Sequence, residues 1–257
     1  MGRSGAYQGL RMPASSPGLR MSGSSKQAGG IRRSSVVTRI APRRSIRGHA
    51  SSESLRRRGQ SYGIPQDGRL SDAVPMPKAK GIHLRRPERA YGTGELVWHL
   101  VTAVAAVKRA FAGTKDIAIG DLSTPDGGPL RGHKSHQSGL DADIAYYTMG
   151  QRTQRHFRDA TPESLDVART WTFIETLLEQ GRVQYMFIDH SLQRALYEHA
   201  REHGSARWRK PESLARVFQY PLPSWVPSGI IRHEPNHKDH IHMRVRRPEH
   251  RQRVAVR

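Results

Sequence analysis

The apolar residues of this chain follow a helical period in three stretches. The clearest stretch runs from Gly94 to Phe111, is apolar on most sides, and is followed by Gly113 as a C-terminal cap. Two further helices are predicted at residues 164–180, where Thr161-Pro162-Glu163 gives the start signal, and at residues 191–202. We expect the first helix to be buried, because it presents apolar side chains in almost every direction.

Shorter apolar or alternating runs, bounded by glycine and proline, predict the strands of a sheet. They lie at residues 81–84, 116–121, 141–147, 184–189, 229–232 and 240–245. The strands and helices are mixed without regular alternation, and no internal repeat is present. The predicted fold class is therefore α+β, with a small, mostly antiparallel central sheet that is flanked by helices.

Residues 1–60 depart from these patterns and are rich in Ser, Gly and Arg. They hold 13 Lys and Arg residues against one acidic residue, Glu53, and so supply +12 of the formal net charge of +21. Such a segment buries too little apolar area to offset the entropy lost on ordering, which predicts a disordered basic tail. Residues 61–80, punctuated by Gly and Pro, are interpreted as a linker.

The predicted organisation has three parts. A disordered tail and linker cover residues 1–70, a folded domain covers residues 71–247, and a short basic tail covers residues 248–257. Residues 1–60 would be drawn to polyanions. They would serve as a solubilising tail, as a nucleic-acid-binding arm, or as an anchor to anionic polymers of the cell envelope, and the sequence leaves these roles and the oligomeric state open.

Absent features narrow the function further. The chain has no cysteine, which excludes disulfides, thiol catalysis and a closed cysteine-type metal site. The most apolar run, residues 100–107, is too short to span a bilayer. No secretory signal is recognisable near the N-terminus.

Two clusters of histidine and aspartate concentrate the candidate chemistry, one at residues 132–144 and one at residues 237–242. In the first, Asp141 and Asp143 are two residues apart on a predicted strand, so their side chains share a face. In the second, His240 and His242 are related in the same way.

These faces can meet if the two strands are neighbours in the sheet. His136, Asp143 and one of the paired histidines would then converge on one point. Three nitrogen and oxygen ligands with a fourth position left open are typical of a catalytic zinc site. Ser135 and Ser138 do not lie in a Gly-x-Ser-x-Gly motif, so a serine nucleophile is not indicated.

The motifs around these residues resemble a known family. They are Gly-Asp-Leu-Ser at residues 120–123, Gly-Gly-Pro-Leu at 127–130, Ser-His-Gln-Ser-Gly-Leu-Asp-Ala-Asp at 135–143 and Asn-His-Lys-Asp-His-Ile-His-Met-Arg-Val at 236–245. Together they resemble the penicillin-insensitive murein endopeptidases, which belong with lysostaphin, the D-Ala-D-Ala metallopeptidases and the hedgehog signalling domain. The resemblance covers about residues 75–247.

The resemblance implies roles for individual residues. It implies that His136, Asp143 and His242 bind Zn²⁺. His240 would assist the attacking water, stabilise the tetrahedral oxyanion, or orient a neighbouring group. His237 is similarly placed in the family's second motif, so the resemblance implies a catalytic role for it too.

Three more residues are candidates for substrate binding or for holding the ligands. His133 matches a family histidine. For Asp141 we expect hydrogen bonds to the ligands rather than metal binding, because a fourth protein ligand would close the site. Asp121 would line the pocket or cap a turn.

As a function, the resemblance implies a zinc D,D-endopeptidase that acts on peptidoglycan cross-links in the periplasm or cell envelope. A D,D-carboxypeptidase that trims stem peptides is the nearest alternative. A different class is an inactive hydrolase fold that binds polyanions or nucleic acid through residues 1–60. The complete set of His136, Asp143, His240 and His242 favours an enzyme, because an inactive site need not retain all four.

Overall fold

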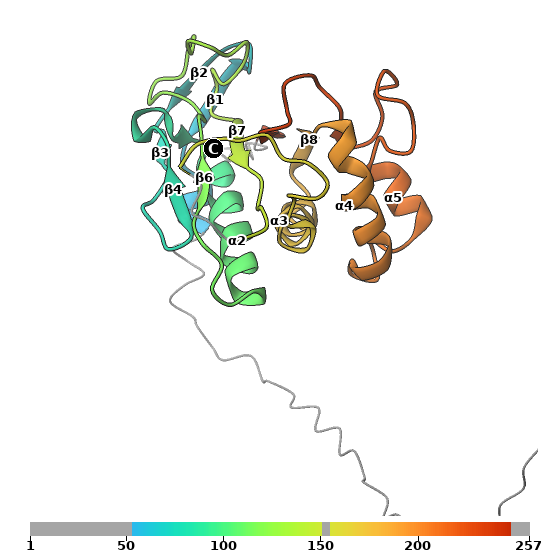
Figure 1. The fold of residues 1–257 in the computed structure, drawn as a ribbon. Coiled ribbons are helices and arrows are strands. Elements are labelled where there is room, and N and C mark those ends of the chain that lie inside the picture. The colour runs from blue at the N-terminus through green and yellow to red at the C-terminus, as the bar shows by residue number, and fades with distance from the viewer. Residues whose placement is uncertain (1–52, 151–154, 248–257) are drawn as a thin grey trace, which may run out of the picture. The chain divides into compact units, whose positions relative to one another are not determined.

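A six-stranded sheet organises the computed structural model, which describes residues 53–150 and 155–247. The strands lie in the order β4-β6-β7-β10-β8-β9. Figure 1 shows β4, β6, β7 and β8 of this sheet. The three central pairings are antiparallel and the two edge pairings, β4–β6 and β8–β9, are parallel. Their bounds are β4 Ile82–Leu84, β6 Ile117–Ile119, β7 Asp141–Ala145, β8 Val183–Phe187, β9 Ile231–Arg232 and β10 His240–Val245.

The three predicted helices are confirmed, each with its ends within three residues of the prediction. Each begins at a side-chain cap that accepts a backbone N–H: Thr93, Asp166 and Asp189. The short α5 and the 3₁₀ helix η1 were not predicted. The bounds are η1 Pro87–Arg89, α2 Gly94–Ala110, α3 Val167–Glu179, α4 His190–His203 and α5 Pro211–Val217.

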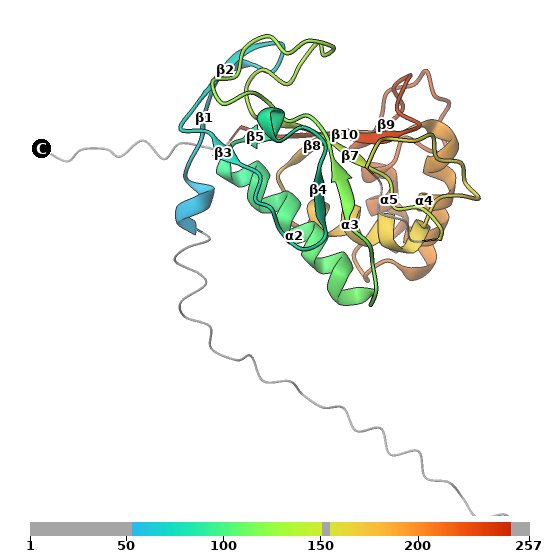
Figure 2. The ribbon, with the colours of Figure 1, turned by 60° about the vertical axis from the view of Figure 1, so that its left-hand side comes forward.

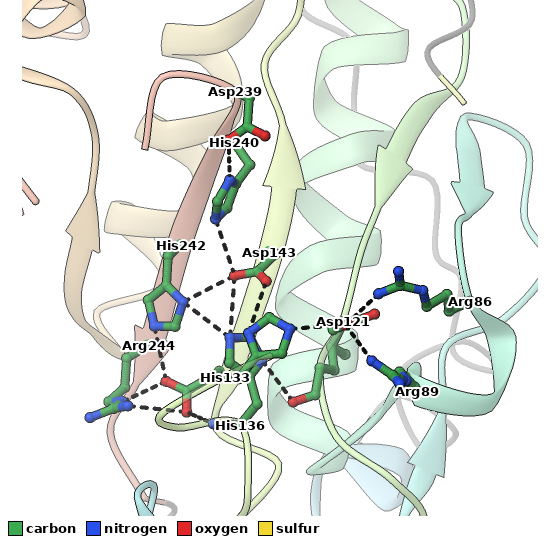
Figure 3. Close-up of polar contacts among 12 residues, drawn as sticks. Arg86, Arg89, Asp121, His133, His136, Asp143, Asp239, His240, His242 and Arg244 are labelled. Carbon is green, nitrogen blue, oxygen red and sulfur yellow. Dashed lines mark hydrogen bonds and ion pairs between the residues drawn. The ribbon is translucent and has the colours of Figure 1, made fainter. Parts of the chain in front are cut away.

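The core lies between the sheet and the pair α2 and α3. Leu100 and Val104 of α2, Trp171 and Ile174 of α3, and Ile144 of β7 are all almost fully buried. Figure 2 shows these helices on one face of the sheet, and Figure 3 shows the polar side chains described below on the other. The alternation along β7 thus divides the core from the candidate site. The α+β class is confirmed, with a sheet that is antiparallel at its centre and parallel at its edges.

The prediction of a linker over residues 61–80 is wrong. Strands β1 (Gln60–Ile64) and β2 (Asp67–Ser71) form an antiparallel hairpin, and β3 (Val74–Pro75) pairs with β5 (Tyr91–Gly92). Gly63, Gly68 and Pro75 lie within these strands, and Pro65 lies in the turn of the hairpin. The ordered fold therefore extends N-terminally of residue 71.

This hairpin supports the loop that carries the first histidine cluster. Leu70 is buried, and its backbone N–H donates to the backbone carbonyl oxygen of Asp126. A Cβ atom added at Gly68 would lie 2.8 Å from Cβ of Ser138. The hairpin and the histidine loop are therefore too close at this point for a side chain on residue 68. Residues 53–56 are helical. The remaining predicted tails, residues 1–52 and 248–257, lie outside the described residues.

Over the described parts of the chain, no helix combines the length and apolar character needed to cross a membrane.

Candidate active site

The register between β7 and β10 brings the two clusters together. His242 lies opposite Asp143, and Arg244 lies opposite the other strand aspartate, Asp141. Residues directly opposite on one face of an antiparallel pair have Cβ atoms about 4.5–5.5 Å apart, within reach of each other's polar atoms. His240 lies opposite Ala145, whose methyl group offers no polar partner. The expectation that the two strands are neighbours is confirmed.

The loop before β7 delivers His136 to the same place. Its φ of 68° lies in the left-handed region, which is uncommon for residues other than glycine. The backbone N–H of His136 donates to Asp141 Oδ2 at 3.0 Å, and its Nδ1 lies 3.0 Å from the carbonyl oxygen of Leu122. With a proton on Nδ1 for that carbonyl, the buried ring directs the lone pair of Nε2 toward β10.

Three ligand atoms converge at this point (Figure 3). His136 Nε2 lies 3.1 Å from His242 Nδ1 and 3.3 Å from Asp143 Oδ1, and the last two atoms are 3.0 Å apart. A tetrahedral ion with bonds of about 2.0–2.1 Å separates its ligand atoms by about 3.3 Å. The triangle therefore has the size that a small N/O-coordinated metal ion requires.

The charge around Asp143 also fits a metal ion. Its carboxylate is 4% exposed, and its ion pairs with other described residues are with four histidines only: His133, His136, His240 and His242. Burial raises the pKa of Asp143, but the charge and hydrogen bond of His136 outweigh it and hold the pKa well below its usual range. A buried carboxylate is normally paired or bound to a metal.

Two histidines compete for the third ligand position. Ligand atoms of His133, His136 and Asp143 all lie within 4.8 Å of one another. However, His133 Nδ1 is 3.7 Å from Asp143, and its Nε2 lies 2.9 Å from Asp121 Oδ2. The distances of 3.0 and 3.1 Å make His242 the better-placed member of the set.

Asp141 orients two of these residues rather than joining them. Its carboxylate pairs with Arg244 through Nε–Oδ1 at 2.5 Å and Nη2–Oδ2 at 3.1 Å, and it lies 3.4 Å from His242 Nε2. Burial lowers the pKa of His242, but the hydrogen bonds to Asp141 and Asp143 outweigh it and raise the pKa to about 9. With Nε2 directed to Asp141, the Nδ1 atom of His242 faces Asp143.

His240 is held by groups that the sequence analysis missed. Its Nδ1 lies 2.5 Å from Asp239 Oδ1, and its Nε2 lies 3.7 Å from Asp143 Oδ1. Its ring stacks on Phe157 with centroids 4.9 Å apart and planes at 10°. The guanidinium carbon of Arg85 lies 4.0 Å from the centre of the Phe157 ring.

His237 lies beside His240, with ring centroids 4.9 Å apart. Its Nδ1 points to the carbonyl oxygens of Glu234 and Pro235 at 3.2 and 2.9 Å. Burial, followed by the charge of His240, lowers the pKa of His237. Its ring is 5.9 Å from that of His242, so it borders the centre without contacting Asp143.

Asp121 closes the opposite side of the site. Its buried Oδ2 accepts from His133 Nε2 at 2.9 Å and from Nη1 of Arg86 and Arg89 at 3.0 and 3.2 Å. Burial raises the pKa of Asp121, but the His133 hydrogen bond and the charge of Arg86 outweigh it and lower the pKa. Asp121 therefore joins His133 to the two arginines on this side of the site.

Some of the missed residues carried a signal in the sequence. Arg244 follows His242 by two positions and so shares its face, and Asp239 is adjacent to His240. Phe157, Arg86 and Arg89 gave no comparable signal, because no spacing connects them to the clusters.

Comparison with known proteins places this arrangement in a family. The profile of the penicillin-insensitive murein endopeptidases matches residues 61–209 of the chain, more than half of its length. The chain belongs to this family. The match includes His133, His136, Asp141 and Asp143 but ends before β10. The pairing of β10 with β7 brings His240 and His242 next to the matched segment.

Two curated family members show the same relationship. A penicillin-insensitive murein endopeptidase of Pectobacterium atrosepticum is 28% identical over 155 residues, which cover 53% of this chain and 54% of that protein. One of Haemophilus influenzae is 38% identical over 84 residues, which cover 32% of this chain and 28% of that protein. The matched regions thus span about half the length of these relatives or less. The family predicted from the motifs is confirmed.

Proposed function

We propose that this chain is a zinc-dependent D,D-endopeptidase that hydrolyses the peptide cross-links of peptidoglycan in the cell envelope. The observation that carries the proposal is the triangle formed by His136 Nε2, Asp143 Oδ1 and His242 Nδ1, with sides of 3.0–3.3 Å. Membership of a family named for murein endopeptidase activity supports the substrate and the location.

In this proposal His136, Asp143 and His242 hold the zinc ion. When bound, zinc lowers the pKa of a water ligand to near 7 and polarises a substrate carbonyl. The protein contributes orientation. The outer nitrogen of His136, Nδ1, contacts the Leu122 carbonyl oxygen, and the outer nitrogen of His242, Nε2, contacts the Asp141 carboxylate. Each inner nitrogen is thereby aimed at the common point, and such outer partners raise the affinity of a site for its metal.

His240 is proposed to move the proton. With Nδ1 bonded to Asp239, the Nε2 atom faces the centre and can accept a proton from the attacking water. The same atom can then donate that proton to the leaving amine. General acid–base catalysis of this kind contributes about 10²–10⁴-fold to rate. His237, whose ring borders His240, is proposed to contact the substrate on that side.

The test separates the two histidines of β10. We expect His240→Ala to retain zinc and to lose about 10²–10⁴-fold in cross-link cleavage, and His242→Ala to lose zinc and activity together. Zinc content is measured by elemental analysis and cleavage by digestion of purified sacculi, with a chelator-treated sample. His203→Ala, an exposed histidine on α4, is the control and should change neither.

Two outcomes would contradict this assignment. A metal-free His240→Ala protein together with a loaded His242→Ala protein would exchange the two roles. Release of terminal D-Ala from stem peptides, without any opening of cross-links, would replace the endopeptidase by the D,D-carboxypeptidase.

A further inference from the structure

We propose that Arg86 and Arg89 form a binding subsite for a free carboxylate of the peptide substrate, next to the reacting centre. The inference rests on the proposed function and specifies the substrate as an acidic peptide. It concerns two residues at the ends of η1 that the metal site does not use.

The local backbone places both arginines on one side. They are three positions apart and flank Pro87, which begins a single turn of 3₁₀ helix. Arg86 is the residue before this turn, and Arg89 is its last residue. Both Nη1 atoms reach the same oxygen, Oδ2 of Asp121, at 3.0 and 3.2 Å. Figure 3 shows the two contacts.

The burial of the three groups decides which charge a ligand meets. The Asp121 side chain is 4% exposed, whereas Arg86 is 46% exposed and Arg89 is 26% exposed. The carboxylate thus lies inside and the guanidinium groups lie outside. Two guanidinium groups share one carboxylate, so this cluster presents a net positive charge to the solvent.

The arginines also retain donors for a ligand. Among the described residues, the side-chain hydrogen bonds of Arg86 and Arg89 all use Nη1, directed to Asp121 and to the carbonyl oxygen of Arg131. A guanidinium group has five N–H donors in a planar fork. That fork matches a carboxylate and binds it through two parallel hydrogen bonds.

The subsite is connected to the metal ligands by one imidazole. His133 bridges Asp121 and Asp143, at 2.9 Å to the first and 3.7 Å to the second. The backbone N–H of Asp143 also donates to the carbonyl oxygen of Asp121 at 3.1 Å. A carboxylate bound here therefore belongs to a residue close to the scissile bond. Because peptidoglycan stem peptides carry free carboxylates, they fit this requirement.

The experiment compares a cross-linked stem-peptide substrate with its carboxylates free and with its carboxylates amidated. For the zinc-loaded enzyme, we expect Arg86→Gln and Arg89→Gln each to raise KM for the free acid about tenfold, the effect of losing one charge-assisted hydrogen bond, with little change in kcat. KM for the amidated substrate should stay the same in all proteins. Arg109→Gln, an exposed arginine at the end of α2, is the control.

Additional substrates identify the carboxylate that is bound, and additional variants control for misfolding. Substrates amidated only at the C-terminus, or only at the diamino-acid residue, show which carboxylate is bound. If a glutamine variant melts at a lower temperature than the wild type, Arg86→Lys and Arg89→Lys replace it. These variants keep the charge but lose the fork, and they too should lose preference for the free acid.

Equal losses on free and amidated substrates would overturn the proposal, since Arg86 and Arg89 would then only clamp η1 to Asp121. Unchanged KM values would overturn it as well. Calorimetric binding of both peptides is measured on the same preparations. A wild-type enzyme that binds the free acid in preference but cleaves neither peptide would refute the endopeptidase function and retain the subsite.

Discussion

Replacing Arg244 by Met should destabilise the protein through the charge it leaves behind. The Arg244 side chain is 7% exposed and that of Asp141 is 0% exposed, and two hydrogen bonds of 2.5 and 3.1 Å join them. Burial raises the pKa of Asp141, but the hydrogen bonds to His242 and Arg244 outweigh it and lower the pKa strongly. Met has no donor, so Arg244→Met leaves Asp141 as a buried carboxylate that has lost both guanidinium hydrogen bonds.

The magnitude follows from the burial of both partners. Removing one member of a buried ion pair costs about 3–5 kcal/mol, a large share of the roughly 5–15 kcal/mol that stabilises a typical domain. Asp141 also accepts from the backbone N–H of His136 and lies 3.4 Å from His242 Nε2. Displacement of Asp141 should therefore lower zinc affinity about 10–100-fold as well.

The assay is urea unfolding of chelator-treated protein, followed by tryptophan fluorescence, so that metal binding does not contribute to the measured stability. Arg194→Met is the matched control, because Arg194 and Glu198 form an ion pair of 2.9 Å on the surface of α4. That variant should leave the urea midpoint unchanged.

A double variant tests the mechanism itself. Asp141→Asn combined with Arg244→Met removes both charges while an amide oxygen can still accept from His136. It should recover much of the stability that Arg244→Met loses. A loss below about 1 kcal/mol in the single variant, or additive losses in the double variant, would show that the pair does not act through an uncompensated charge.

Two further predictions concern other parts of the chain. Phe157→Ala should lower kcat about 2–12-fold, with KM and zinc content unchanged, because an aromatic stack contributes about 0.5–1.5 kcal/mol. Phe157→Tyr keeps the stack and should restore kcat. A changed KM would contradict the role of Phe157 in positioning His240. Deleting residues 1–52 should leave cross-link cleavage intact and abolish binding to anionic polymers, which in the full chain should weaken steeply with salt. Salt-insensitive binding, or equal binding by the shortened chain, would exclude the tail as the binding segment.

Much of the candidate site was predictable from local spacing. The alternation of side chains along a strand places Asp141 with Asp143, and His240 with His242, before any fold is known. Once β7 and β10 pair, the same rule adds Arg244 to this face.

The remainder depends on contacts that are distant in the sequence. Arg86 and Arg89 lie 35 and 32 residues from Asp121, with no periodic pattern between them. The stack on His240 requires Gly120, where a Cβ would lie 2.5 Å from Cζ of Phe157. Similarly, the hairpin at residues 60–71 is too short and too polar to be recognised as two strands, although Leu70 is buried.

The pairing of β7 with β10 gives His240 and His242 different surroundings, on which the different roles proposed for them rest. His242 faces Asp143 across the strands and is drawn into the ligand triangle, whereas His240 faces Ala145. Because the residue directly opposite is apolar, the ring of His240 is oriented by Asp239 and by the Phe157 ring. A shift of one residue in this register would turn every one of these side chains toward the helices. The apolar side chains of β7 that pack on α2 and α3 therefore also keep the polar side chains on the opposite face of the sheet.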